Sequence, residues 1–158
     1  MGLDMYLNKK TYVGANYEHN KVTGTLSLRK NGNKLNINLT RVVNVEEQFA
    51  YWRKANHIHM WMVNNIQYGE DDCKEYQIYQ EQIEKLLEDC KKVKKDHSLA
   101  ETLLPTGSGF FFGSTDYDDG YYEDIDYTIE MMEQALKEIE DDKTTGNYSP
   151  EFYYQSSW

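Results

Sequence analysis

The sequence predicts one α+β domain, in which an antiparallel sheet packs against three main helices. Three observations favour this class: apolar residues alternate near the start of the chain, an Asn-Gly pair separates two further alternating segments, and later segments repeat apolar residues at helical spacing. Strands followed by helices with interspersed strands are typical of α+β domains. We expect residues 1–158 to form a single domain, because a chain of this length buries a sufficient core without disulfide or metal support.

The predicted sheet combines an N-terminal strand, the Asn-Gly hairpin, a Phe-rich strand and a C-terminal strand. Leu3, Met5 and Leu7 alternate with more polar residues, which predicts a half-buried strand over 2–7 or slightly longer. At the other end, residues 152–158 are predicted as the last strand, after a turn-rich segment over 142–150.

Asn31 and Gly32 are predicted to form the two-residue loop of a β-hairpin, because both central residues of a type I′ turn need positive φ. The pairs that follow from this loop are Lys30–Asn33, Leu28–Leu35, Leu26–Ile37 and Gly24–Leu39, with Arg29–Lys34, Ser27–Asn36 and Thr25–Asn38 between them. The aliphatic side chains therefore share one face of the hairpin, and the polar side chains share a solvated face.

Helical spacing is expected to begin after Asn44. Asn44 with Glu47 resembles a capping box and predicts a first helix over 45–67. Two more helices are predicted by apolar residues at the i, i+3, i+4, i+7 spacing of one helix face. These faces are Tyr79, Ile83, Leu86, Leu87, Cys90 and Val93 for the second helix, and Tyr121, Ile125, Ile129, Met132, Leu136 and Ile139 for the third. A short helical turn over 98–104 stops at Pro105.

Three consecutive phenylalanines predict a buried strand over 109–114, because an unbroken apolar run between glycines is typical of one. The segment is not a phosphate loop, since no Lys precedes its Ser and no strand precedes the glycines. A ligand could still approach its backbone closely, with Ser108 and Ser114 supplying hydroxyl groups. The alternative is a strand that only packs against the first helix.

The formal charge of −10 is distributed unevenly along the chain. Residues 1–67 contain nine basic and four acidic residues, whereas residues 68–158 contain eight basic and twenty-three acidic ones. Solvated helix faces can explain the acidity. The acidic half disfavours direct binding of nucleic acid, and no apolar segment approaches the length of a membrane span. We therefore expect a cytoplasmic protein that binds neither nucleic acid nor membrane, and whose basic half can still hold an anion.

The candidate binding residues lie along one face of the predicted first helix. Arg53, His57 and Trp61 are spaced four apart, with Asn56 and Asn64 beside them, so their side chains are expected to form a row. Together they offer donors for an anion and a flat surface for a ring. Further donors are expected from Ser108, Ser114, Tyr154 and Gln155. The alternative is that Arg53 pairs with an acidic residue and His57 is a hydrogen-bonded core residue.

No catalytic set, metal site or cofactor is predicted. His57 and His59 are about 200° apart around a helix, so they cannot ligate one ion together. The acidic segment 116–120 lacks the glycine position and the final Glu of a calcium loop, and acids at a helix N-terminus explain it. No Ser, Cys and His spacing singles out a nucleophilic triad.

Six segments resemble a family of small proteins of bacteriophages and prophages. They are 1–7 (MGLDMYL), 52–61 (WRKANHIHMW), 71–73 (DDC), 103–106 (LLPT), 109–114 (GFFFGS) and 152–158 (FYYQSSW), and they span nearly the whole chain. The resemblance implies an accessory phage protein working in the bacterial cytoplasm. It implies no particular activity.

Three hypotheses about function follow. The first is a binding module that sequesters a small anionic aromatic ligand, such as a nucleotide-derived immune signal of the host, without turnover. The second is an acidic inhibitor that occupies the basic groove of a host nucleic-acid-binding protein. The third is a nucleotide-acting enzyme that uses His57 as general acid or base and Arg53 to hold phosphate. The ligand and the oligomeric state stay open.

Overall fold

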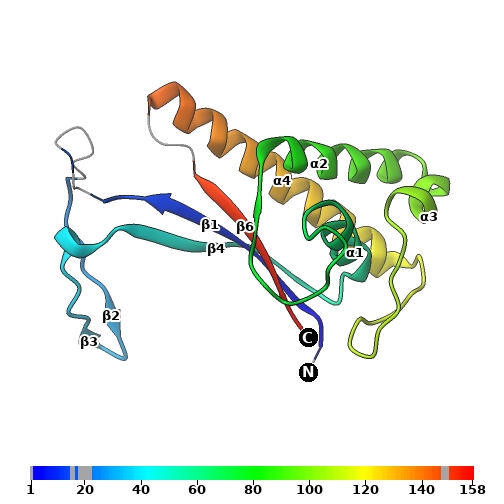
Figure 1. Cartoon of the computed structure of the whole chain (residues 1–158), viewed down its shortest axis with the longest axis horizontal. Helices are drawn as coiled ribbons and strands as arrows, with labels where there is room; N and C mark the ends of the chain where they lie inside the picture. The colour runs from blue at the N-terminus through cyan, green and yellow to red at the C-terminus, as the bar shows by residue number, and fades with distance from the viewer. Residues whose placement is uncertain (1, 15–16, 18–22, 147–149) are drawn as a thin grey trace.

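The computed structural model describes residues 2–14, 17, 23–146 and 150–158. A four-stranded antiparallel sheet has the order β4-β1-β6-β5, and helices α2 and α4 run side by side over one of its faces (Figure 1). The strands are β1 (Asp4–Tyr12), β4 (Asn44–Arg53), β5 (Tyr76–Ile78) and β6 (Glu151–Ser157). The helices are α1 (Asn56–Asn65), α2 (Gln80–Lys95), α3 (Ala100–Leu103) and α4 (Asp119–Thr145). The predicted α+β class with an antiparallel sheet is confirmed.

The core lies between the sheet and the helices. Leu3, Met5 and Leu7 are fully buried, as the alternation at the start of the chain predicts. Their register partners on the neighbouring strands supply Ala50, Trp52, Tyr154 and Ser156 to the same side of the sheet. The last strand is confirmed as β6, which lies between β1 and β5 rather than at an edge.

Both later helices are confirmed, and α4 is longer than predicted. It continues to Thr145, where Gly146 at a φ of 74° ends it in the left-handed conformation that glycine adopts readily. The predicted turn-rich segment is therefore helical over its first residues, and residues 147–149 of that segment lie outside the described chain. The short turn over 98–104 is a 3-10 turn (His97–Leu99) that leads into α3.

The first predicted helix is wrong over its first part. Residues 44–53 form β4, which pairs with β1 over nearly its whole length. Ala50 and Trp52 are both buried, a period of two that belongs to a strand. The pairing with β1 therefore outweighs the helix-start signal at Asn44. Lys54 then turns the chain with a φ of 62°, and α1 begins only at Asn56.

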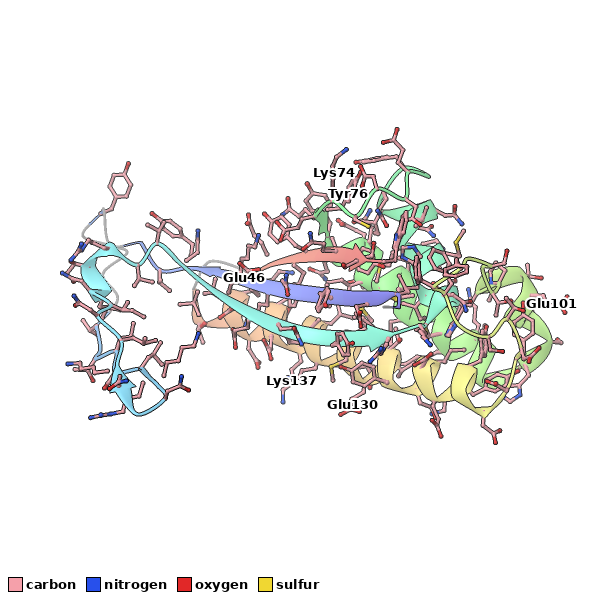
Figure 2. The ribbon with its side chains drawn as sticks, turned by 90° about the horizontal axis from the view of Figure 1, so that it is seen from below. Glu46, Lys74, Tyr76, Glu101, Glu130 and Lys137 are labelled. Atoms are coloured by element: carbon pink, nitrogen blue, oxygen red, sulfur yellow. The ribbon has the colours of Figure 1, made fainter. Side chains whose placement is uncertain are left out.

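The Asn-Gly hairpin forms, but it is not part of the main sheet. Its turn has φ of 51° at Asn31 and 80° at Gly32, and strands β2 (Arg29–Lys30) and β3 (Asn33–Lys34) pair in the predicted register. The Leu35 N–H also donates to the Leu28 carbonyl at 2.8 Å. Beyond this pair the ladder ends, so the predicted Leu26–Ile37 and Gly24–Leu39 pairs lie outside it. We call residues 23–43 the arm; Figures 1 and 2 show the hairpin projecting away from the sheet and the helices.

The predicted Phe-rich strand is instead a loop. Residues 104–118 connect α3 to α4, and the Phe110 side chain at the tip of this loop is 96 % exposed. The Leu3 N–H donates to the Phe111 carbonyl at 3.0 Å, which attaches the loop to the start of β1. Apart from this bond, residues 109–114 pair with no strand among the described residues, so the apolar run forms a loop that is anchored at Phe111.

Among the described residues, no helix combines the length and the apolar character that crossing a membrane requires.

Candidate functional site

The candidate site is a polar cleft of about 310 Å³ at the end of the sheet, where the start of α1 meets the start of α4. Four elements contribute: the end of β4 with the turn after it, the first turn of α1, the loop before α4, and the first turns of α4. The lining residues are Arg53, Lys54, Asn56, His57, Thr106, Ser114, Asp116, Asp118, Gly120, Tyr121, Glu123 and Asp124.

A left-handed turn at Lys54 forms one wall of the cleft. The Lys54 N–H donates to the Leu3 carbonyl at 2.8 Å, and the Asn56 N–H donates to the Lys54 carbonyl at 2.8 Å. Positive φ is uncommon for a residue with a Cβ atom. The two hydrogen bonds hold this conformation, so that Arg53 ends β4 and Asn56 begins α1 within three residues.

Asn56 fixes the loop over 104–118 against α1. Its amide nitrogen donates to the carbonyls of Phe112, at 3.0 Å, and Ser114, at 2.7 Å, while its amide oxygen accepts from the Gly107 N–H at 2.9 Å. These bonds use three of the hydrogen bonds that an asparagine side chain can make. Asn56 therefore positions the cleft wall, and both hydrogens of its amide are already donated to the loop.

His57 is a second buried polar residue of the cleft wall, beside Asn56. It is 2 % exposed, and its imidazole lies against the Tyr121 ring with centroids 4.1 Å apart. Its Nε2 atom is buried and has no hydrogen-bond partner among the described residues. Burial lowers the pKa of His57 from 6.5 to about 3, because the charged imidazolium loses its hydration there. His57 is therefore neutral near pH 7.

Acidic residues line the side of the cleft formed by α4. The Asp118 carboxylate caps α4 by accepting from the Tyr121 N–H at 3.1 Å. Burial raises the pKa of the Asp124 carboxyl to about 6, with smaller contributions from the charges of Glu123 and Asp118. No ion pair involves Asp124 within the described part of the chain. The cleft thus presents basic groups at one side and a poorly solvated carboxyl group at another.

The structure does not bring all the predicted binding residues together. Arg53, Asn56, His57 and Ser114 line the cleft, although Arg53 belongs to β4 and not to the helix that carries His57. The Arg53 guanidinium is exposed, with its Nε 3.9 Å from Asp4 Oδ1. The predicted row of Arg53, His57 and Trp61 therefore does not exist as a helix face.

Trp61 and Tyr154 are core residues outside the cleft. The Trp61 indole donates to the buried Asp89 carboxylate at 2.9 Å. The Tyr154 hydroxyl lies 2.7 Å from His59 Nδ1, and His59 Nε2 lies 3.0 Å from Asp71 Oδ2. If Nε2 carries the proton that Asp71 accepts, then Nδ1 accepts from the tyrosine. This arrangement gives hydrogen-bond partners to the buried Tyr154 hydroxyl and to both ring nitrogens of the buried His59.

The remaining predicted residues lie elsewhere on the molecule. Gln155 donates to the Cys73 carbonyl at 3.2 Å, while Asn64 and Ser108 are exposed and do not line the cleft.

The sequence does not predict several of the lining residues. These are Lys54 in the turn after β4, Thr106 in the loop before α4, and Tyr121, Glu123 and Asp124 of α4. The acidic segment 116–120 was the available signal, because acids before an apolar helical face predict a helix N-terminus. The contact between segment 116–120 and the start of α1 depends on the fold, because the two are about sixty residues apart in the sequence.

Within the described residues, no group of three or more His, Cys, Asp or Glu side chains is arranged to hold a metal ion. Comparisons of the chain with protein-family models, with curated proteins and with solved structures find no significant match.

Proposed function

We propose that this protein is a binding module that captures a small, polar, nucleotide-like ligand in the cleft and holds it without turnover. The observation that carries the proposal is the unpartnered Nε2 atom of His57 in the cleft wall. A buried polar atom without a partner costs free energy. A ligand that forms a hydrogen bond to this atom would remove that cost.

The charges of the cleft define the chemistry of the ligand. Arg53 and Lys54 can hold an anionic group such as a phosphate. The carboxyl groups on the α4 side, including Asp124, suit hydrogen-bond donors such as the amino group of a base or the hydroxyls of a ribose. Acidic residues outnumber basic ones in the lining, which disfavours a ligand with several phosphates. A mononucleotide or a cyclic nucleotide meets these conditions.

The state of His57 supports binding rather than proton transfer. A general acid or base works best with a pKa near the operating pH. His57, with a pKa of about 3, offers a neutral hydrogen-bonding group instead. The likeness to phage and prophage proteins supports the further part of the proposal, in which capture of the ligand removes a host immune signal in the infected cytoplasm.

Isothermal titration calorimetry with a panel of mononucleotides, cyclic nucleotides and ADP-ribose tests the proposal. We expect at least one of them to bind and to be recovered intact by mass spectrometry. In 15N-labelled protein, the resonance of His57 Nε2 should shift when that ligand binds. The double variant Arg53→Gln/Lys54→Gln should weaken binding at least tenfold, because a hydrogen bond to a charged group contributes about 1.5 to 3 kcal/mol.

Two matched variants control for surface changes. Asn64→Ala changes an exposed asparagine outside the cleft, and Lys74→Gln removes an exposed positive charge near β5 (Figure 2), so both should bind as the wild type does. The proposal is wrong if no ligand of the panel gives heat. It is also wrong if binding survives unchanged in both the Arg53/Lys54 double variant and His57→Gln.

A further inference from the structure

Asp124 is the least solvated carboxylate of the cleft. The other three carboxylates of the lining, those of Asp116, Asp118 and Glu123, are exposed, whereas Asp124 is half-buried. Within the described chain, no hydrogen bond or ion pair involves the Asp124 carboxylate, and no positive charge is among the groups that shift its pKa. Taking a carboxylate partly out of water without a partner costs free energy. A ligand that donates to both of its oxygens would remove this cost.

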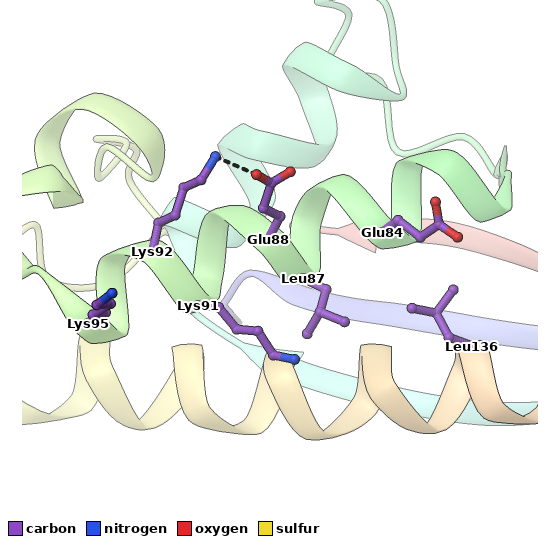
Figure 3. A pocket seen from close by; sticks show the side chains of 7 residues that line it. All are labelled: Glu84, Leu87, Glu88, Lys91, Lys92, Lys95 and Leu136. Atoms are coloured by element: carbon purple, nitrogen blue, oxygen red, sulfur yellow. Dashed lines mark ion pairs between the residues drawn. The ribbon is translucent and has the colours of Figure 1, made fainter.

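The carboxylates of a groove between α2 and α4 show the contrast. In this groove of about 390 Å³, Glu84 accepts from the Gln80 amide at 2.7 Å, and Glu88 forms an ion pair with Lys92 at 2.7 Å (Figure 3). Both groups therefore have partners from the protein itself. The carboxylate of Asp124 differs from them because its partner has to come from a ligand.

The base of a nucleotide can supply two donors to one carboxylate. The Watson–Crick edge of guanine carries two adjacent donors, N1–H and the 2-amino group, which can bond to the two oxygens in parallel. Adenine and cytosine each place an acceptor nitrogen beside their amino group, and uracil has one N–H between two carbonyls. An ionised carboxylate repels these acceptors, because it can only accept hydrogen bonds. Guanine is therefore the base that matches Asp124.

The ribose hydroxyls are the other pair of neighbouring donors in a nucleotide. They are well hydrated, so they suit the exposed carboxylates of Asp116, Asp118 and Glu123, around which water remains. The flat base is the part of the ligand that gains most from leaving water. The half-buried position of Asp124 therefore favours the base over the ribose.

We propose that the ligand of the cleft is a guanine nucleotide, whose base donates from N1 and from the 2-amino group to the Asp124 carboxylate. Its phosphate is held by Arg53 and Lys54, which line the same cleft. This inference rests on the proposed function and adds the identity of the base to it.

Calorimetric titration with nucleotides that differ only in the base tests the inference. Within the 5′-monophosphates or within the cyclic monophosphates, we expect the guanine member to bind roughly tenfold or more tightly than the adenine, cytosine, uracil and hypoxanthine members, because each of these lacks at least one of the two donors. Hypoxanthine lacks only the 2-amino group, so it isolates one hydrogen bond. The 2′-deoxy form of the guanine nucleotide should bind within roughly threefold of the ribose form, since Asp124 does not hold the ribose.

Asp124→Asn gives the inference a test by gain of function. The asparagine amide can accept from N1–H of xanthine and donate to its 2-carbonyl, so this variant should bind xanthosine monophosphate roughly tenfold more tightly than the wild type does, and the guanine nucleotide roughly tenfold more weakly. The change keeps the size of the side chain and removes a half-buried charge, so the midpoint of thermal unfolding should not fall. Glu130→Gln removes an exposed carboxylate of α4 outside the cleft (Figure 2), and this matched control should keep the preference for guanine.

Binding of nucleotides without a preference for guanine would overturn this inference and leave the proposed function standing. An Asp124→Asn variant that still prefers the guanine nucleotide to the xanthine nucleotide would do the same. So would a ligand that loses more affinity without its 2′-hydroxyl than without its 2-amino group. If no nucleotide binds, the proposed function and this inference are both wrong.

Discussion

At the scale of the residue, His57 has the most unusual environment in the cleft. Its burial keeps the native pKa near 3, whereas the unfolded chain titrates at about 6.5. Below pH 6.5 the unfolded state therefore binds a proton that the native state does not. The stability associated with a neutral His57 is complete above pH 6.5 and is lost progressively as the pH falls toward 3.

We predict that His57→Gln reduces the sensitivity of the protein to acid. Between pH 7 and pH 5 the wild type should lose about 2 kcal/mol of unfolding free energy through His57. The variant should lack this part of the decrease, even if it is less stable at pH 7. Urea unfolding at the two pH values measures it. Asn64→Ala, which changes an exposed residue without a titratable group, is the control and should keep the wild-type difference. An equal pH dependence in His57→Gln and wild type would contradict the prediction.

For Asn56, the sequence predicts the position of the side chain but not its hydrogen-bond partners. The sequence places it next to His57, and the structure keeps it at the cleft. Its amide, however, binds three backbone groups of a loop that begins about fifty residues later. An asparagine side chain can form hydrogen bonds with a ligand or with the backbone. The position of that loop determines which of these bonds Asn56 forms.

At the scale of the element, the loop over 104–118 forms the cleft wall because glycines let it approach α1 and the turn before it. Gly113 has a φ of 89°, and a Cβ atom there would lie 3.0 Å from Lys54 Cβ. Any other residue would be strained in this conformation. The loop and the Lys54 turn therefore depend on each other.

We predict that Gly113→Ala destabilises the protein by about 1 to 2 kcal/mol, through the backbone strain and the contact with Lys54. Gly24→Ala is a matched control in the arm, where no heavy atom lies within 4 Å of the added Cβ, and its effect should stay below about 0.5 kcal/mol. The shift of the urea midpoint at a constant m-value measures both. Equal stability of the two variants would show that the loop adapts without strain.

Strand β4 shows why the helix predicted from residue 45 onward is wrong over its first part. Asn44 with Glu47 has the side chains of a capping box, but the following residues find hydrogen-bond partners in β1. In α2 and α4 the apolar faces repeat over sixteen and twenty-seven residues. The apolar faces of α2 and α4 are therefore predicted correctly, whereas in residues 44–53 the pairing with β1 outweighs the local helix signal.

At the scale of the whole molecule, the last strand, β6, lies inside the sheet and not at its edge. β6 pairs with β1 on one side and with β5 on the other, and it buries Phe152, Tyr154 and Ser156. The fold therefore requires residues 151–157, which pair with both β1 and β5.

We predict that a chain ending at Pro150 does not fold cooperatively, because β1 and β5 lose their shared neighbour and the core loses two large aromatic side chains. Loss of amide dispersion in a 1H–15N NMR spectrum would show it. Removal of Trp158 alone is the control: it breaks an exposed hydrogen bond to Asp71, of 3.0 Å, and an edge contact with the Phe112 ring, and should cost about 1 kcal/mol. A dispersed spectrum from the shorter chain would refute the prediction.

The sequence by itself determined the features that repeat along the chain or reside in a few neighbouring residues. These are the alternation at Leu3, Met5 and Leu7, the two long amphipathic helices, the type I′ turn at Asn31-Gly32 and the separation of acidic from basic halves. Each depends on local geometry or composition, which the order of residues specifies directly. The tertiary structure alone decided that residues 44–53 form a strand, that the three phenylalanines form a loop, and that the arm remains uncovered. It also decided that His57 packs against Tyr121 of α4, because burial and pairing depend on segments that meet only after the chain has folded.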